Sequence, residues 1–266
     1  MKSKIKRDGH IHTPFCPHGT KDTLEAYANE AIRLGNEEIT FTEHFPLPLG
    51  VTTQNFAREC SLLDEEVSSY LEAVTEIRRK FKGKLKINKG FEVDYVEGFE
   101  EEITKSLNQY GEEIEDAILS VHFVRYEGKC YAIDYLPEFE ALLNTIGSLE
   151  DIYDLYFRTL LKSVEADLGP FKPKRIGHPG LIRIFNQKYP ISYDDKGLFN
   201  EIVSKMLVEG YEVDFNVAGL RKIDCKETYP SGKLLELIKS YDIKCVGGSD
   251  AHQVAQMALL SSFNKI

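Results

Sequence analysis

The sequence lacks the apolar stretches that membrane insertion or secretion requires. It contains no apolar run of 18 residues, and its basic start, MKSKIKRDGHIH, is followed by no run that could form a signal-peptide core. Positive charge is not in excess either, since 33 Lys and Arg stand against 43 Asp and Glu, for a formal net charge of −10. Nucleic acids and anionic membranes bind clustered Lys and Arg. We therefore expect a cytoplasmic protein with neither partner, and a small cationic or metal-bound substrate fits better.

Paired cysteines and domain linkers are also missing. The five cysteines are an odd, scattered set without a CxxC pair, which favours reduced thiols over a disulfide framework. Cys16 stands two residues before His18 and could bind metal, although small buried cysteines are common in ordinary cores. No repeat, low-complexity tract or Pro/Gly/Ser linker marks a boundary, so we predict one domain over residues 1–266.

Short β-rich runs alternate with helical patterns along the chain. Alternation of this kind predicts βαβ units and a parallel sheet. The seven candidate strands are residues 2–10, 37–44, 85–94, 116–123, 174–180, 211–219 and 243–252. Helical periodicity occurs in residues 22–34, 64–81, 149–169 and 198–209. In the first of these helices, Asp22 and Glu25 fit a variant of the capping box, and Gly35 can adopt the left-handed conformation after the last turn.

A chemically active side chain lies at or just past the C-terminal end of every candidate strand. An open sheet gathers ligands at one switch point, whereas a closed barrel lets every strand contribute to a shared face. We therefore predict an α/β fold, a distorted TIM-like barrel with seven strands whose site lies at the C-terminal strand ends. The strand-end residues are His10 and His12, His44, Glu92, His122, His178, Arg221, and Asp250 with His252.

All seven histidines belong to this pattern, with His18 in the segment DGHIHTPFCPHG. A single such histidine is more often a core residue bonded to a backbone carbonyl, but that reading weakens when each one ends a strand. Neutral imidazole is the commonest protein ligand for Zn, Fe and Mn, and an HxH pair can aim both rings at one ion if the chain leaves the pleat there. The pattern therefore predicts a metal site.

Two acids extend the candidate ligand set. With Glu92 and Asp250 there are nine candidates, which exceeds the three or four protein ligands of one catalytic ion, so two or three ions are implied. Either carboxylate could bridge ions about 3.5–4 Å apart. Asp8 and Glu43 adjoin ligand candidates and are interpreted as groups that orient imidazoles.

Two arginines follow the later strands, Arg183 in GHPGLIRIF and Arg221 in DFNVAGLRK. Guanidinium groups bind phosphate through paired hydrogen bonds, so arginines beside a metal cluster indicate an anionic phosphoryl group. The alternative is that each arginine pairs with a surface acid.

The motifs HIH, TEH, FE at residue 92, SVH, GHPG and SDAH, together with His18, resemble those of the polymerase and histidinol phosphatase (PHP) family. The resemblance extends from residue 8 to residue 252. The segments HTPFCPHG, NVAGLRK followed by ETYPS, and GGSDAH are similar to the histidinol-phosphatase branch.

The resemblance implies a distorted (β/α)7 barrel with a trinuclear site. It implies one ion held by His10, His12, Glu92 and Asp250, a second by Glu92, His122 and His178, and a third by His18, His44 and His252, with Glu92 as the bridge. The family binds Zn, Fe or Mn, and the sequence does not choose among them.

The leading hypothesis is metal-dependent hydrolysis of L-histidinol phosphate, a step of histidine biosynthesis. Arg183 and Arg221 would bind the phosphoryl group, and Asp250 or His252 could pass a proton to the leaving alkoxide. The long segments 45–66 and 123–144 lie where a barrel builds substrate-covering loops. Two alternatives stay open: a nuclease or general phosphoesterase on the same scaffold, which predicts a basic groove, and a non-catalytic metal-binding protein, which needs no phosphate-binding arginines.

Overall fold

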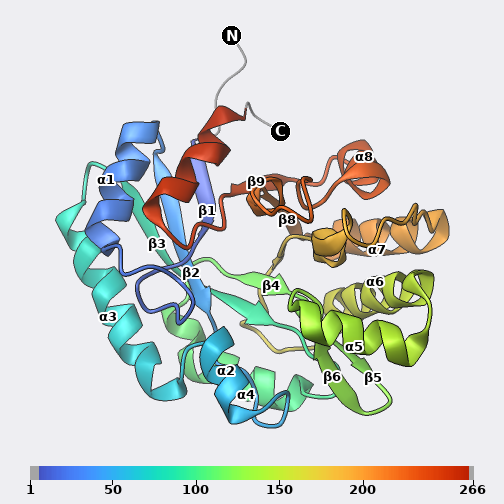
Figure 1. Cartoon of the computed structure of the whole chain (residues 1–266). Helices are drawn as coiled ribbons and strands as arrows, with labels where there is room; N and C mark the ends of the chain where they lie inside the picture. Colours follow the sequence, from blue (N-terminus) through green and yellow to red (C-terminus); the bar gives the residue numbers. More distant parts are fainter. Residues whose placement is uncertain (1–5, 264–266) are drawn as a thin grey trace.

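The computed structural model describes residues 6–263, apart from the side chain of Lys196. Seven parallel strands form one sheet in the order β1-β2-β3-β4-β7-β8-β9, and helices cover its outer side (Figure 1). The first and last strands meet, because the amide of Asp250 donates to the carbonyl of His10 at 2.8 Å and Ile11 bridges Ala251 in parallel register. The sheet is therefore a nearly closed barrel. Within the described residues, none of the helices has the length and apolar content to cross a bilayer.

All seven predicted strands occur in the barrel. Residues 2–5 of the first candidate lie outside the described residues. The barrel strands are β1 (Arg7–Ile11), β2 (Glu38–His44), β3 (Lys86–Asp94), β4 (Ile118–Ser120), β7 (Arg175–Ile176), β8 (Glu212–Asn216) and β9 (Cys245–Gly248). Pairing of β1 with β2 shifts register between Asp8 and Ile11, so the chain leaves the regular pleat at the HIH motif, as that motif required.

The helix expected at residues 22–34 begins two residues later, as α1 (Leu24–Leu34). The predicted cap at Asp22 is wrong, since the Thr23 side chain accepts the hydrogen bond from the Ala26 amide. The Asp22 carboxylate instead accepts from the Val254 amide. Gly35 closes the helix in the left-handed conformation as predicted, with φ 86°.

The other three predicted helices occur, and four further helices and a hairpin join them. The helices are α2 (Gln54–Cys60), α3 (Asp64–Lys80), α4 (Glu100–Tyr110), α5 (Leu136–Ile146), α6 (Leu149–Glu165), α7 (Lys196–Val208) and α8 (Gly232–Ser240). The hairpin comprises β5 (Phe123–Tyr126) and β6 (Lys129–Ala132). The four short 3-10 helices are η1 (Gly111–Glu113), η2 (Leu181–Phe185), η3 (Ala218–Leu220) and η4 (Val254–Ser262). Segments 45–66 and 123–144, interpreted as covering loops, therefore contain regular structure: α2 and the start of α3 in the first, β5, β6 and most of α5 in the second.

A charged cluster lies in the interior near the N-terminal ends of the strands. The Asp116 carboxylate accepts from Arg7 at 2.5 Å, from Arg175 at 3.0 Å and from Thr40 at 2.6 Å. Arg175 is only 2% exposed. Burial would raise the pKa of Asp116, but the charges of Arg175 and Arg7 hold it below its ordinary value of 3.8. The Asp116 carboxylate therefore joins β1, β7 and the segment before β4, and it supplies the counter-ion that the buried Arg175 charge requires.

Replacing Asp116 with asparagine should lower the free energy of unfolding by about 3 kcal/mol, because Arg175 would keep a buried charge without its counter-ion. The folded pKa of Asp116 lies below 3.8, so this contribution is complete above that pH and is lost as the pH falls through the folded value. Urea unfolding at neutral pH and near pH 3 measures it. Glu25→Gln is the control, since the exposed pair of Glu25 with Lys80 should matter little. Equal stability of both variants would contradict the expectation.

Candidate metal centre

Every histidine of the chain lies at the C-terminal end of the barrel, around one cavity. Each of the seven rings lies with its centroid within 5.3 Å of another ring of the group. β1 carries His10 and is followed by His12, β2 ends at His44, β3 carries Glu92, and the segments after β4, β7 and β9 carry His122, His178, and Asp250 with His252. The nine side chains predicted as ligands are thus brought together from the strand ends and the loop that holds His18.

Glu92 stands between two groups of imidazoles, and each of its oxygens faces a different group. Oε1 lies 2.7 Å from His178 Nε2 and 3.7 Å from His122 Nε2. Oε2 lies 3.3 Å from His10 Nε2 and 3.4 Å from His12 Nε2. The carboxylate is 1% exposed. A carboxylate with an oxygen in each of two ligand groups has the geometry of a bridge between two ions.

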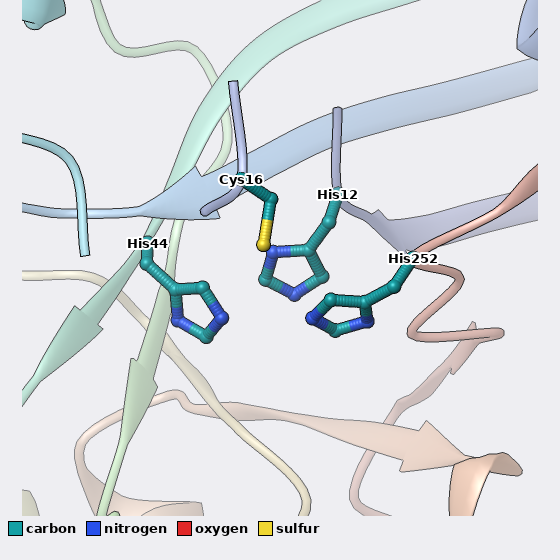
Figure 2. A group of neighbouring side chains, drawn as sticks. All are labelled: His12, Cys16, His44 and His252. Atoms are coloured by element: carbon teal, nitrogen blue, oxygen red, sulfur yellow. The ribbon is translucent and has the colours of Figure 1, made fainter. Parts of the chain in front are cut away.

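Among residues 6–263, three groups of candidate ligand atoms are compact enough to hold an ion. They are His10, His12 and Glu92; Glu92, His122 and His178; and His12, Cys16, His44 and His252, each with its ligand atoms within 4.8 Å of one another. Figure 2 shows the third group, in which the Cys16 sulfur and three imidazoles converge. Asp250 joins the first group, with Oδ1 3.4 Å from His12 Nε2. His18 joins the third through its Nε2, 3.0 Å from His252 Nε2.

Most of the imidazoles are oriented by an oxygen on the side away from the cavity. In each of these, Nδ1 can donate to the oxygen, which leaves the Nε2 lone pair facing the centre. The pairs are His10 with Asp214 (2.8 Å), His12 with Glu43 (3.1 Å), His122 with Asp94 (2.8 Å), His18 with the Glu59 carbonyl (2.8 Å) and His252 with the Asp250 carbonyl (3.2 Å). Glu43 has its predicted role. The prediction for Asp8 is wrong, since its carboxylate accepts from the backbone amides of Ser249 and His10 instead.

The donor set fits divalent metal ions. His10 and His12 bring Nε2 atoms to 3.2 Å of each other, and both rings are fully buried. Two such nitrogens can both keep a lone pair at this distance only if a cation lies near them. His44 Nε2 and His178 Nδ1 are buried and have no hydrogen-bond partner within residues 6–263. Buried imidazoles with free nitrogens beside carboxylates match the ligand chemistry of Zn, Fe and Mn.

The electrostatics of the cavity keep the acids ionised. Burial would raise the pKa of Glu92, but the charges of His10 and His122 hold it well below its ordinary range. Burial would also raise the pKa of Asp250, but the charge of His10 and a hydrogen bond with His12 hold it well below its ordinary value. Burial lowers the pKa of His44 well below its ordinary value. Although burial opposes protonation, the neighbouring carboxylates raise the pKa of His10 to about 10 and that of His122 well above its ordinary value, so a metal ion must displace protons from these two rings.

The backbone at two ligand positions adopts conformations that non-glycine residues rarely take. Asp250 has φ 51° and His178 has φ 23°. Strained backbone of this kind persists where surrounding contacts hold it, and it is concentrated at functional sites. Gly248 makes room for the ligands, because a Cβ there would lie 2.1 Å from Asp214 Oδ1 and 2.8 Å from His10 Cβ. The GGSDAH motif therefore provides space for packing as well as two of the candidate ligands.

The cavity has a volume of about 340 Å³ and includes Arg221 in its wall. Arg221 Nη1 donates to the Ser249 carbonyl at 2.9 Å, and Nη2 donates to the Asp250 carbonyl at 3.0 Å, which fixes the guanidinium beside a ligand. Arg183 is placed differently. Its Nε and Nη2 donate to both carboxylate oxygens of Glu227, at 2.7 and 2.8 Å, and it lines a neighbouring cavity.

Some groups around the centre were not predicted as part of it. Asp94 orients the His122 ring and Asp214 orients the His10 ring, and both acids lie within strands that were predicted from the sequence. The position of Asp94 could have indicated its role, because it ends the FEVD run two residues after the candidate ligand Glu92. Asp214 carries none, since its contact with His10 depends on the pairing of distant strands. Cys16, given little weight on sequence grounds, has a place in the third ligand group.

The chain is similar to known proteins over nearly its whole length. The family model described as the PHP domain matches residues 8–217. The chain is 41% identical to a histidinol-phosphatase of Bacillus subtilis over 255 residues, 95% of each chain. The crystal structure of hisK from Listeria monocytogenes is 35% identical and matches with a TM-score of 0.88 over 95% of this chain and 97% of that one. Histidinol phosphate phosphatase from Lactococcus lactis, solved with Zn, L-histidinol and phosphate, shares the fold at 20% identity with a TM-score of 0.67, over 98% and 95% of the two chains.

Proposed function

The chain belongs to the PHP domain family, and from this premise we propose that it is a histidinol-phosphatase. The reaction is hydrolysis of L-histidinol phosphate to L-histidinol and inorganic phosphate, which places the enzyme in histidine biosynthesis. The observation that carries the proposal is the position of Glu92, with one oxygen in each of two imidazole groups, in a cavity that Arg221 also lines. Identity of 41% over nearly the whole of a histidinol-phosphatase supports the choice of substrate.

The proposed cofactors are two or three divalent ions, drawn from Zn, Fe and Mn. Bound ions supply Lewis acidity, which lowers the pKa of water to about 7 and offsets negative charge on phosphoryl oxygens. We assign His10, His12, Glu92 and Asp250 to one ion, and Glu92, His122 and His178 to a second. We assign His18, His44 and His252 to a third, and Cys16 lies close enough to His44 and His252 to join it.

The chain itself contributes binding, orientation and proton transfer. Arg221, held by two backbone carbonyls, presents its guanidinium to the phosphoryl oxygens and stabilises the charge that grows on them. A water oxygen forms the new bond to phosphorus as the bond to the histidinol oxygen breaks. That oxygen leaves as an alkoxide, and we assign to Asp250 or His252 the transfer to it of the proton that the attacking water loses. Both line the cavity.

Arg221→Ala should lower kcat/KM for L-histidinol phosphate by about 10²-fold, because a charge-assisted contact to the transition state is lost. The assignment of Arg183 to phosphate stays a prediction, and Arg183→Ala tests it against Glu227→Gln. If Arg183 only pairs with Glu227, the two variants should behave alike and retain activity. Metal content, measured on the same preparations, should persist in all three. Unchanged activity in Arg221→Ala would remove that residue from the site.

Phosphate release from a substrate panel tests the proposal as a whole. The panel contains L-histidinol phosphate, other small phosphomonoesters and single-stranded DNA, and metal analysis accompanies it. We expect L-histidinol phosphate to give the highest kcat/KM. A preference for DNA, or no turnover of L-histidinol phosphate, would overturn the assignment. The proposal further includes a single domain over residues 1–266 and a cytoplasmic location, which suits the five free cysteines.

A further inference from the structure

One acid in the wall of the metal cavity takes no part in the ligand groups. Asp134 lines the same cavity as the metal ligands and Arg221. Its side chain is exposed, and within residues 6–263 it forms no hydrogen bond or ion pair. The other acids of that wall, Glu92 and Asp250, are held among imidazoles. Asp134 is therefore a carboxylate that faces the substrate space and is free to bind a cation.

The backbone on either side of Asp134 is fixed to a metal-binding segment. The hairpin β5–β6 starts beside His122 and returns to it, because the amide of Ile133 donates to the His122 carbonyl at 2.9 Å. The Ala132 amide donates to the Glu138 carboxylate at 2.6 Å. Asp134 follows directly, close enough for its charge to act on the His122 imidazole and the Tyr229 hydroxyl. Its distance from the metal groups is therefore set by the fold.

The charges around the cavity are separated. Arg221 and the exposed Lys222 follow β8, whereas Asp134 belongs to the segment after β4, and β7 lies between those two strands in the barrel. The wall beyond β7 is apolar at Leu181 and Ile184. A ligand that spans this cavity would contact the cationic side chains and the metal ions at one end and the Asp134 carboxylate at the other, with an apolar surface between them. A phosphomonoester that also carries an ammonium group has the matching distribution of charge.

We propose that Asp134 binds the ammonium group of L-histidinol phosphate and selects for amino-substituted phosphomonoesters. This inference rests on the proposed function and adds the residue that recognises the cationic end of the substrate. Because Asp134 is exposed, its contact with the ammonium belongs at the low end for a charged hydrogen bond, and its loss should raise KM by about tenfold. The reacting phosphorus is bound elsewhere, so kcat should stay within about twofold of wild type.

The test compares Asp134→Asn with wild type on two substrates that differ by one group. L-Histidinol phosphate carries the ammonium, and 3-(imidazol-4-yl)propyl phosphate lacks it. The variant should show the rise in KM only with L-histidinol phosphate, and Asp134→Glu should recover part of the loss. Inhibition constants give a second measurement: that of L-histidinol should rise in Asp134→Asn, and that of inorganic phosphate should not change. Glu127→Gln, at the turn of the same hairpin, is the control for the lost charge.

Each outcome separates this inference from the proposed function. Turnover of L-histidinol phosphate by the wild type reports the proposed function, and its absence overturns both claims. An equal loss on the two substrates would show a general effect of charge on the metal centre and would overturn the role of Asp134. Unchanged KM in Asp134→Asn, with normal wild-type turnover, would overturn the role of Asp134 alone.

Discussion

Glu92→Gln should lower kcat for L-histidinol phosphate by at least about 10⁴-fold, equivalent to about 5.5 kcal/mol of transition-state stabilisation. The carboxylate is buried and serves two ligand groups, so the neutral amide weakens two ion positions together. Metal analysis should show the loss of at least one ion per chain. No other described side chain has an oxygen in each of two of the compact ligand groups.

Glu97→Gln is the matched control, because Glu97 pairs with Lys162 on the surface a few residues further along the chain. It should retain full activity and metal content. Circular dichroism and thermal melting of both variants separate a damaged site from a damaged fold. If Glu92→Gln kept activity within tenfold of wild type with its full metal content, the bridging assignment would be wrong.

Removal of the metal ions should abolish activity and lower the melting temperature by about 8 °C. An ion present at about a thousandfold above its Kd stabilises the folded state by about 4 kcal/mol, and about 2 °C accompanies each kcal/mol in a protein of this size. In the apoprotein the nitrogens of His10 and His12 face each other without a cation between them. Ligand imidazoles must be deprotonated to bind, so chelation should become easier as the pH falls.

Calorimetry of the chelated protein before and after addition of Zn, Mn or Fe(II) measures both effects. Each metal that occupies the centre should restore the melting temperature, and the one that gives the highest kcat identifies the best catalytic metal among the three. The chelated protein must keep its far-UV circular dichroism for the comparison to hold. A chelated, metal-free sample that melts at the wild-type temperature would show that the ligand cluster contributes nothing to stability.

The sequence predicted the barrel because chemistry and periodicity pointed to the same boundaries. His44, His122 and His178 lie at or just past the C-terminal ends of short apolar runs, so each strand was found together with its candidate ligand. The hairpin β5–β6 was missed for a local reason. Its turn is Glu127-Gly128, with φ 48° and 80°, and Glu-Gly is a weaker turn signal than Asn-Gly. The segment therefore resembled an irregular loop.

Parts of the centre that depend on distant pairing could not be read from the sequence. The hydrogen bond of Asp214 to His10 joins β8 to β1, and no local pattern reports that approach. The pairing of Arg183 with Glu227 depends on the loop after β8. Thr23 rather than Asp22 caps the helix because the first amide of η4, that of Val254, donates to the Asp22 carboxylate. In each case a tertiary contact decided between residues that were locally equivalent.

The seam that closes the barrel also limits when the candidate metal centre can form during synthesis of the chain. His10 and His12 are synthesised before Asp250, and the seam forms only when Ala251 reaches Ile11 and the Asp250 amide reaches the His10 carbonyl. Until then the nascent chain exposes imidazoles whose partners have not been made. The candidate ion position that combines His10, His12 and Asp250 is therefore complete only after the last strand of the barrel has been made.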